Sequence, residues 1–574
     1  MPPRLHDWLP ILGWSRRYTA QHAAADGVAA AVVTLMLIPQ SLAYALLAGL
    51  PPQAGLYASM APLLLYAVFG SSNTLAVGPA AVTSLMTAAA AGAAAAHTGA
   101  SHAEAALWLA LLSGGLMLLM GVARLGFVAH FLSHPVVSGF VSASALLIAA
   151  SQLKHLLGVP LQGDTLPALL VQLPGRLREL HGPTLVMGLA VLVALWSARR
   201  HLKPLLRRWG ASAFVADIAS KAAPVLALVL SIALAAGLDL AQAGVKVVGA
   251  VPSGLPPLTW PRWGEPTADL VQALLMPALL ISLVGFVESV SVGQSLAAKR
   301  RERIDPDAEL RGLGASNIGA ALTGGFPVTG GFSRSVVNFD AGARTPAAGV
   351  LTAFGLALAA LFLTPWLYHL PQATLAATIV VAVLSLVDMG AFTRTWRYSS
   401  ADFVALALTF GLTLAVGVEA GLMAGVGSSL LLWLYRSSRP HIATVGQVPG
   451  TEHYRNVLRH AVLTHPQILG LRVDESLYFA NARYLEDHVA AQVASHPHVR
   501  HVVLQCSAVN DVDASALESL EAIAERLQDA GVTLHLSEVK GPVMDRFKRS
   551  DFLTQLRGQV FLTHHQAVTT LIGE

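Results

Sequence analysis

An arginine between two serines lies in a part of the chain that is otherwise strongly apolar. Residues 324–342 read GGFPVTGGFSRSVVNFDAG, so that Arg334 stands between Ser333 and Ser335, behind a pair of glycines. A guanidinium group costs about 2.5 to 3.5 kcal/mol to insert at the centre of a membrane helix, and such groups face cavities or partners. These residue types therefore indicate an anion site, in which Arg334 supplies charge and the serines supply hydroxyl donors.

Other interpretations of this stretch remain open. Arg334 could extend to a lipid headgroup, or it could pair with Asp340 later in the same stretch. Gly330 and Gly331 could simply allow two helices to pack closely, as glycines often do in membranes.

A carboxyl group stands in a second apolar run, GFVESVSVG, as Glu288. Loss of hydration inside a membrane favours the neutral form of a carboxyl group. Glu288 would therefore suit a site that takes up a proton when an anion binds. It could instead form a permanent ion pair with Arg334, or lie nearer the cytoplasmic face beside Lys299.

The composition is that of a membrane protein. Of 574 residues, 54% are hydrophobic and 12% are charged, whereas about 25% are charged in a soluble domain. The first twenty residues lack a signal peptide, which predicts a cytosolic N-terminus. Cys506 is the single cysteine, so an internal disulfide is excluded. No metal-ligand spacing, nucleophile elbow or P-loop occurs, and we expect no enzyme activity, cofactor, metal or nucleic-acid partner.

Apolar segments long enough to span a bilayer recur from DGVAAAVVTLMLIPQSLAYALLAGL to VEAGLMAGVGSSLLLWLY. We count about fourteen spans, of which two are short and broken by glycine. The basic loops SARRHLKPLLRRW, AAKRRERIDPDAELR and TRTWRY all fall on the cytosolic side of this count, in agreement with the positive-inside rule. The sequence thus predicts a cytosolic segment 1–22, a transmembrane domain 23–436, and a linker with a cytosolic domain 437–574.

The two short segments are TLAVGPAAVTSLM (74–86) and FPVTGGFSRSVVN (326–338). Each begins with strand-like residues, passes a glycine and continues as a piece of helix too short to span alone, and each is third in its group of seven spans. Broken segments at corresponding positions of two halves indicate a transport site at the midplane. The exposed N-terminal N–H groups and the dipoles of two such half-helices favour an anion. Gln40 in the first span and Glu288 in the eighth lie at equivalent depths of an inverted repeat.

The last part of the chain alternates strand and helix signals. HVVLQCSAV, the helical ASALESLEAIAERLQDAG and GVTLHLSEV follow one another after residue 440, which predicts a small α/β domain.

Two long motifs resemble the sulfate permease (SulP) family, the bacterial relatives of the solute carrier 26 anion transporters. They are residues 37–86, which include LIPQSLAYALLAGLPPQAGLYASM, and FPVTGGFSRSVVNFDAGARTP. The order of a membrane domain and a STAS domain is also similar. The resemblance implies an all-α membrane domain of seven plus seven inverted spans with core and gate domains, a cytosolic STAS domain, a homodimer and a location in a bacterial inner membrane.

The resemblance also implies a substrate site between the third and tenth spans. Its residues would be Val77, Gly78, Pro79, Ala80, Gly331, Phe332, Ser333, Arg334 and Ser335, with Gln40, Tyr44 and the coupling residue Glu288 beside them. Family substrates include sulfate, bicarbonate, chloride and dicarboxylates such as fumarate, and many bacterial members are proton or sodium symporters.

Two residues bear on the coupling ion. Sodium-coupled bicarbonate members tend to carry an aspartate and hydroxyl groups in the eighth span and to lack the arginine of the tenth. Glu288 and Arg334 depart from that pattern and favour a proton-coupled anion symporter. An uncoupled exchanger, a channel-like chloride pathway, a sodium-coupled bicarbonate transporter and a membrane-anchored regulator are the alternatives.

In the C-terminal domain, AVNDVDASALESLEAI resembles the STAS signature, with Asp513 and Ser515 at its aspartate and serine positions. Ser515 could simply cap a helix. It could also be a phosphorylation point or a docking point for a cytosolic protein partner, as in stand-alone relatives of this domain.

Overall fold

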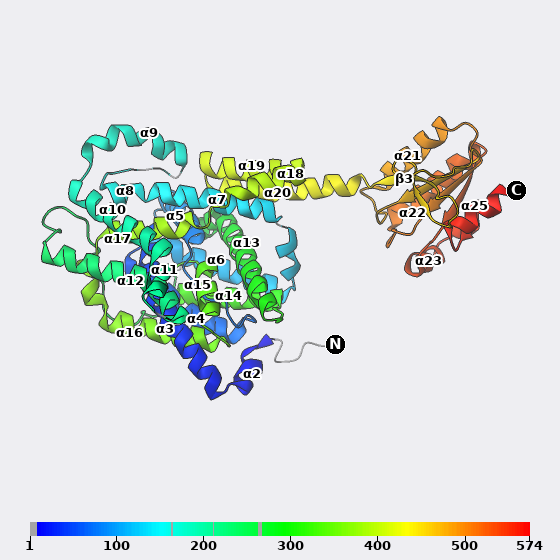
Figure 1. Ribbon diagram of the computed structural model, residues 1–574. Coiled ribbons are helices and arrows are strands. Elements are labelled where there is room, and N and C mark those ends of the chain that lie inside the picture. Colours follow the sequence, from blue (N-terminus) through cyan, green and yellow to red (C-terminus); the bar gives the residue numbers. More distant parts are fainter. Residues whose placement is uncertain are drawn as a thin grey trace. The chain divides into compact units, whose positions relative to one another are not determined.

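The computed structural model describes residues 8–131, 133–161, 163, 165–210, 212–261 and 267–573 (Figure 1). Residues 1–7 of the expected N-terminal segment lie outside this range. The chain divides into two compact units, the first ending at Ser429 and the second beginning at Leu430. Two short elements precede the first long helix: α2 (Ile11–Trp14) and the 3₁₀ turn η1 (Ser15–Arg17).

Fourteen helices in the described part of the chain follow one another in two series of seven. The first series is α3 (Ala20–Leu47), α4 (Pro52–Phe69), α5 (Ala81–Thr98), α6 (His102–Val122), α7 (His134–Ser151), α10 (Gly182–Ser197) and α12 (Ala213–Gly237). The second is α13 (Thr267–Lys299), α14 (Pro306–Leu322), α15 (Phe332–Asp340), α16 (Ala347–Phe362), α17 (Gln372–Leu384), α19 (Ser400–Ala415) and α20 (Val418–Ser438).

Shorter elements join these helices. They are the 3₁₀ turns η2 (Gly126–Phe131), η3 (Leu177–Glu179) and η5 (Thr364–Leu367), the π-helical turn η4 (Ala198–Leu202), and the helices α8 (Leu153–Leu157), α9 (Leu166–Arg176), α11 (Lys203–Arg208) and α18 (Met389–Tyr398).

Seven helices in the described residues are long and apolar enough to cross a membrane alone, and three more are apolar but shorter. The remaining four of the fourteen are α4, α5, α14 and α15. Helix α14 can have a low hydropathy because it packs against both α4 and α6. A Cβ atom on Gly114 of α6 would lie 2.8 Å from the carbonyl oxygen of Gly314, so the backbones of α6 and α14 approach closely.

The packing of the two series is related by a repeat. Helix α3 packs against α16 as its counterpart α13 packs against α6, and α3 contacts α5 and α15 as α13 contacts α15 and α5. Two short strands, β1 (Val77–Gly78) and β2 (Thr329–Gly330), precede the third helix of each series. They pair antiparallel across the repeat. The inverted arrangement predicted from the broken segments is therefore present in the fold.

One broken segment is longer than expected. Helix α15 has only 9 residues, but α5 has 18 residues and is therefore about 27 Å long. The alanine-rich run after Met86 continues α5 beyond the predicted end of this segment. Neither α5 nor α15 is among the helices of the described residues that are long and apolar enough to cross a membrane alone.

The second unit contains the predicted α/β domain, built on a six-stranded sheet in the order β4-β3-β5-β6-β7-β8. The strands are β3 (Ile442–Gln447), β4 (Tyr454–Asn456), β5 (Ile468–Val473), β6 (His501–Gln505), β7 (Thr533–Ser537) and β8 (Val560–Phe561). Strands β5 to β8 run parallel, whereas β3 runs antiparallel to both β4 and β5.

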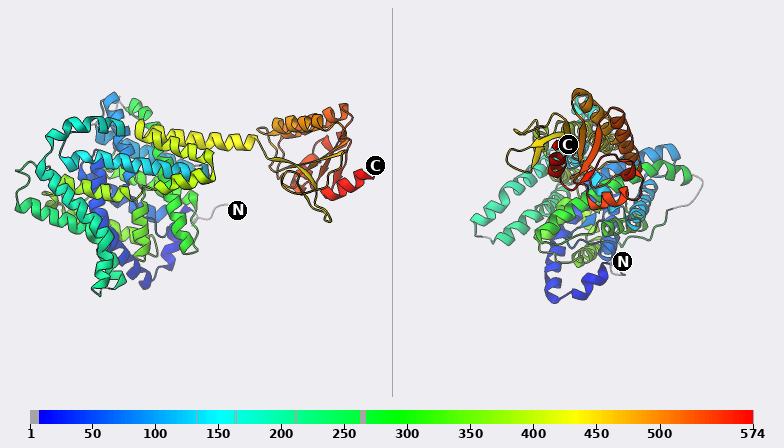
Figure 2. Two further views of the ribbon diagram at one scale, coloured as in Figure 1. Left: turned by 45° about the horizontal axis from the view of Figure 1, so that its top comes forward. Right: turned by 90° about the vertical axis from the view of Figure 1, so that its right-hand side faces the viewer.

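Helices cover both faces of this sheet (Figure 2). They are α21 (Ala482–Ser495), α22 (Ala514–Asp529), α23 (Gly541–Phe547), α24 (Phe552–Gln555) and α25 (His564–Ile572). Val502 packs in the larger core with α21 and α22, while its neighbour Val503 packs with α25. The alternation of buried side chains along β6 thus places α25 on the opposite face.

Candidate functional site

The two broken segments meet at β1 and β2. Val77 pairs with Gly330 and Gly78 pairs with Thr329, and helices α5 and α15 begin directly after these strands. Neither N-cap residue, Ala80 nor Gly331, accepts a hydrogen bond through a side chain. The first-turn N–H groups of both helices therefore have no side-chain acceptor, which is the arrangement that favours a bound anion.

Helices α13 and α14 hold β2 in place through buried polar side chains. The Ser289 hydroxyl lies 2.9 Å from the Thr329 hydroxyl and accepts a hydrogen bond from the Gly330 N–H group at 2.9 Å. On the other side, the Asn317 side chain donates to the carbonyl of Val328 and accepts from its N–H group, each at 2.9 Å. These hydrogen bonds fix the backbone of β2 and the residue before it. They satisfy polar backbone groups that have no partner within a helix or a wider sheet.

Two side chains of α15 hold the other segment. The Ser335 hydroxyl accepts a hydrogen bond from the Ala76 N–H group at 3.0 Å and donates to the Gly331 carbonyl at 2.8 Å. Asn338 donates to the carbonyl of Thr74 at 3.0 Å. The expectation that the Ser335 hydroxyl is available to an anion is wrong here, because backbone groups occupy it.

Arg334 has a different environment from the one predicted. Its side chain is 2% exposed. Its guanidinium donates to three backbone carbonyl oxygens, those of Gly78 (2.9 Å), Thr329 (3.3 Å) and Pro79. We expected the N–H donors of Arg334 to face a cavity and an anion. This expectation is wrong here, because backbone carbonyl groups of both broken segments accept these hydrogen bonds. The two alternatives, contact with a lipid headgroup and an ion pair with Asp340, do not apply either, because the side chain of Arg334 is buried and its partners are backbone carbonyl groups.

The guanidinium of Arg334 lies against two glycines, one from each broken segment. A Cβ atom on Gly331 would come within 2.8 Å of Nη2, whereas one on Gly78 would lie 3.6 Å from the guanidinium, an ordinary van der Waals distance. Of the three guanidinium nitrogens of Arg334, Nε alone is buried without a hydrogen-bond partner among the described residues. A side chain at position 331 would thus contact the guanidinium too closely, whereas one at position 78 would fit beside it.

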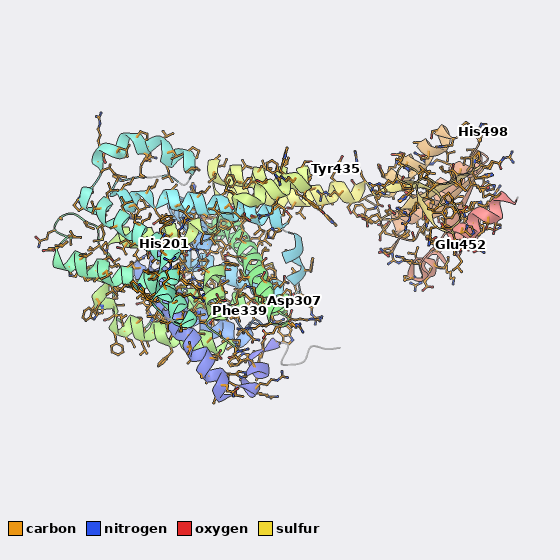
Figure 3. The ribbon with its side chains drawn as sticks, viewed as in Figure 1. His201, Asp307, Phe339, Tyr435, Glu452 and His498 are labelled. Carbon is orange, nitrogen blue, oxygen red and sulfur yellow. The ribbon has the colours of Figure 1, made fainter. Side chains whose placement is uncertain are left out.

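Tyr44 and Glu288 lie close enough to Arg334 to interact with it electrostatically. Within the described ranges Glu288 and Arg334 form no ion pair, which excludes the permanent pair considered above. Lys299 lies 5.7 Å from the ring centroid of Phe339, labelled in Figure 3, at the far end of α15. The structure therefore brings a phenol, a carboxyl and a guanidinium group together at the crossing of the two segments.

A cavity of ≈ 250 Å³ is lined by Ser333, the residue before Arg334, and by Val337 of the same helix, while Arg334 and the residues of β1 and β2 do not line it. Residues of α3 and α15, among them Gln40 and Ser333, form one side of it, and residues of α10, η4, α12 and α17 form the other. The Gln40 Oε1 atom is buried without a hydrogen-bond partner in the part of the chain that the structure describes. Gln40 and Ser333 are thus the predicted site residues that reach the cavity.

Arg199 also lines this cavity and was missed in the sequence. It donates a hydrogen bond to the carbonyl of Val381 at 3.0 Å. In the sequence Arg199 is one of several basic residues of the loop between the sixth and seventh spans. Only its contact with Val381 of α17 in the folded chain distinguishes it from the others.

The other predicted residues occupy two kinds of place. Val77, Gly78, Pro79, Ala80 and Tyr44 are buried around the crossing. Phe332 is 51% exposed at the first position of α15.

The predicted residues of the α/β unit have distinct roles. Asp513 is the N-cap of α22: one carboxylate oxygen accepts from the Ala516 N–H group and the other from the Phe479 N–H group, both at 2.8 Å. Ser515 is exposed within the first turn, so the interpretation of Ser515 as the cap is wrong. Burial raises the pKa of Cys506 to about 12, which makes this thiol unreactive.

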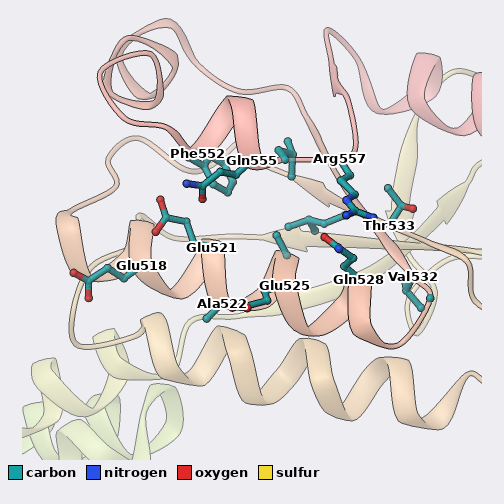
Figure 4. Close-up of a pocket in the computed structure, with 14 residues that line it drawn as sticks. Glu518, Glu521, Ala522, Glu525, Gln528, Val532, Thr533, Phe552, Gln555 and Arg557 are labelled. Atoms are coloured by element: carbon teal, nitrogen blue, oxygen red, sulfur yellow. The ribbon is translucent and has the colours of Figure 1, made fainter.

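A larger hollow of ≈ 670 Å³ lies on the α/β unit beside α22 and α24 (Figure 4). Glu518, Glu521 and Glu525 line it together with Arg557. Three carboxylates against one guanidinium disfavour an anion, so this hollow is not the anion site.

Comparisons with known proteins agree with this architecture. The sequence model described as the sulfate permease family matches residues 24–409, and that of the STAS domain matches residues 460–567. The chain is 35% identical over 584 residues to "Sulfate transporter 4.1, chloroplastic" of Arabidopsis thaliana, covering 98% of this chain and 83% of that protein. It is 32% identical over 564 residues to a probable sulfate transporter of Mycobacterium tuberculosis, covering 98% of this chain and 97% of that one.

Solved structures share the fold. Murine solute carrier 26 family member A9, an anion transporter in the inward-facing state, superposes with a TM-score of 0.87 at 22% identity, covering 99% of this chain and 94% of that one. The transmembrane domain of the cyanobacterial bicarbonate transporter BicA gives a TM-score of 0.60 at 21% identity, covering 71% of this chain and 99% of that one.

Proposed function

The chain belongs to the sulfate permease family, a family of transporters and not of enzymes, and we propose that it is a secondary active transporter of a small anion. Candidate substrates are sulfate, bicarbonate and dicarboxylates such as fumarate. The observation that carries the proposal is the crossing of β1 and β2, where two helix N-termini without a side-chain cap meet Arg334, and where the neighbouring residue of α15, Ser333, lines a cavity.

The anion would bind at the N-termini of α5 and α15. Ser333 and the first-turn N–H groups would donate hydrogen bonds to it, and Gln40 would donate through its amide. Arg334 would act in two ways. It fixes the two termini by its hydrogen bonds to both segments, and its charge attracts the anion through the weakly polar interior.

The cavity separates two groups of helices that would move against each other. Helices α3, α4, α6, α13, α14 and α16 pack among themselves, and so do α7, α10, α17 and α19. The crossing of β1 and β2 belongs to the first group, the core. A sliding or rocking movement of this core along the second group, the gate, would carry the anion across the membrane.

Proton coupling would act through Glu288. Its carboxyl group lies within electrostatic range of Arg334 without pairing with it, so a negative Glu288 competes with an anion for the same positive charge. Protonation of Glu288 removes this competition and would accompany anion entry. Glu288→Gln keeps the neutral form permanently, and we expect it to retain anion exchange but lose acceleration by an inward proton gradient.

The cellular setting of the proposal is a multi-pass protein of a bacterial inner membrane, with both termini in the cytosol and two chains in a homodimer. The STAS domain would bind a cytosolic protein, and the exposed Ser515 at the start of α22 offers a place for phosphorylation or docking.

Uptake of labelled sulfate, bicarbonate and fumarate into liposomes tests the proposal. The purified protein would be given an inward proton gradient, an inward sodium gradient or neither. Uptake of one anion driven by protons supports the symporter and identifies its substrate. Uptake driven by sodium would replace it with a sodium-coupled transporter, and flux that ignores both gradients would replace it with an uncoupled exchanger or a channel.

A further inference from the structure

A second hollow of ≈ 520 Å³ lies at the end of the membrane unit where the described chain begins. Its wall comes from α2, η1, the start of α3, the residues after α4, the start of α14 and the residues between α15 and α16. It shares no lining residue with the cavity at Ser333. Its volume falls in the range typical of sites for small organic ligands, about 300 to 1,000 Å³.

The hollow carries unpaired positive charge. Arg17 and Arg344 both line it, and among the described residues neither guanidinium has a hydrogen bond, an ion pair or an aromatic partner. Arg300 adds a like charge within electrostatic range of Arg344. The acid in the wall, Asp305, already accepts from the Asp307 N–H group and lies 3.9 Å from Arg311. Two more carboxylates lie nearby: Asp26 accepts hydrogen bonds from the backbone N–H groups of Arg344 and Thr345, and Glu302 accepts one from the lining residue Asn73. Neither pairs with the guanidinium groups of Arg17 and Arg344, which are exposed and face the hollow without an ion pair among the described residues.

Helix N-termini add to this positive potential, and a buried ring nitrogen offers a further polar contact. Helices α3, α14 and α16 all begin at the hollow, which His22, Ala308 and Thr345 line from their first turns or just before them. The positive ends of three helix dipoles thus converge on the same space. The Nδ1 atom of His22 is buried without a hydrogen-bond partner in the described ranges.

The remaining wall has a polar and an apolar part. Ser71 and Asn73 line the polar part, and their side chains donate hydrogen bonds to Glu309 and Glu302. The other part is apolar. Pro10, Gly13, Trp14 and Ala308 line it, and the Trp14 indole is fixed by a hydrogen bond of 3.0 Å to the carbonyl of Ala67. An inorganic ion would fill only the charged part of such a hollow. A ligand that fits all of it carries an anionic group for the arginines and an organic body for the indole and proline.

We propose that this hollow is a binding site for an organic phosphate, whose phosphate group the guanidinium groups of Arg17 and Arg344 hold. Guanidinium forks match phosphate oxygens in bidentate geometry. Two sources share this chemistry: a soluble nucleotide, and the headgroup of an anionic lipid such as phosphatidic acid. Bound ligand would link η1 to the residues after α15. It would thereby act on α3 and α15, because Asp26 of α3 accepts hydrogen bonds from the N–H groups of Arg344 and Thr345.

The test uses the full chain in nanodiscs of phosphatidylcholine. Equilibrium binding of labelled ATP and AMP is measured for the parent, Arg17→Gln, Arg344→Gln and Arg16→Gln. Arg16 is the matched control, because it is an exposed neighbour in η1 that does not line the hollow. A second arm adds phosphatidic acid to the nanodiscs and counts retained lipid by native mass spectrometry.

We expect saturable binding in one arm, with affinity reduced about tenfold or more by each of the two lining variants, since a hydrogen bond to a charged group contributes about 1.5 to 3 kcal/mol. Arg16→Gln should stay within about twofold of the parent. Binding of nucleotide in the first arm assigns a soluble ligand, and retention of phosphatidic acid in the second assigns a lipid. The proposal is overturned if neither arm shows saturable binding, or if Arg16→Gln loses as much affinity as the other two. Unfolding midpoints of all variants verify that they are folded.

Discussion

Replacing Gly331 with alanine should displace Arg334, and Gly78→Ala should not. The Cβ atom of the first variant would lie 2.8 Å from Nη2, 3.0 Å from Cζ and 3.1 Å from Nε of Arg334. The Cβ atom of the second would lie 3.6 Å from the nearest guanidinium atoms. Gly331 has φ −78° and ψ 130°, which alanine adopts without strain. The two variants thus add the same methyl group beside one side chain, and only Gly331→Ala brings it closer than van der Waals contact.

The magnitude follows from what the guanidinium would lose. Overpacking of a buried site costs about 1 to 3 kcal/mol, and movement away from Gly331 would lengthen the hydrogen bonds to the carbonyls of Gly78 and Thr329. If the position of Arg334 sets the anion site, a loss of about 1 to 3 kcal/mol in anion binding corresponds to roughly a 5- to 150-fold weaker affinity. Gly78→Ala should remain within about twofold of the parent.

The assay is equilibrium binding of the transported anion, with the unfolding midpoint measured in parallel. Equal affinities of Gly331→Ala and Gly78→Ala would refute the reasoning that Arg334 must occupy its place between the two segments. A lower midpoint of Gly331→Ala with unchanged anion affinity would show that Arg334 only fastens the two segments together.

Further predictions concern the α/β unit. The pKa of both His535 and His564 is lowered to about 4, chiefly by burial and, for His535, also by the nearby His501; an unfolded imidazole titrates near 6.5. The unfolded state therefore binds more protons than the folded state below pH 6.5. The unit should lose about 2 kcal/mol of folding stability per histidine between pH 7 and pH 5. The measurement is hydrogen-exchange protection of β5 to β8 in the full chain. Protection that is unchanged or rises at pH 5 would contradict this. Asp513→Ala removes the acceptor for two N–H groups and should lower the stability of the unit by about 1 to 2 kcal/mol, while Ser515→Ala stays within about 0.5 kcal/mol. Equal effects of the two changes in the same exchange experiment would show that the cap is not important.

Much of the architecture could be predicted because it depends on local patterns. Fourteen apolar segments, their basic loops and the two glycine-broken segments are visible in the sequence, and strand and helix periodicities indicate the α/β unit. The length of α5 was missed, because an alanine-rich run reads as weakly apolar although alanine is the best helix former.

The site itself was predicted less well, because side-chain partners lie far away in the sequence. The sequence shows that Arg334 places a charge in the membrane. The direction of its side chain is set by the carbonyls of Gly78 and Pro79, which lie in the other half of the repeat. Arg199 lines the cavity through packing alone. The cap of α22 falls on Asp513 and not on Ser515 because the Phe479 N–H group needs the second carboxylate oxygen.

The central claim is that an anion binds at the N-terminal end of α15, where Arg334 lies. Arg300 provides the control, because it donates hydrogen bonds to the carbonyls of Ala343 (2.5 Å) and Phe339 (3.3 Å) at the opposite end of the same half-helix. The most direct measurement is equilibrium binding of the transported anion to Arg334→Ala and Arg300→Ala, each checked for folding by its unfolding midpoint. We predict that folded Arg334→Ala loses anion binding while Arg300→Ala keeps it. Binding that survives in Arg334→Ala, or that is lost equally in both variants, would contradict the account.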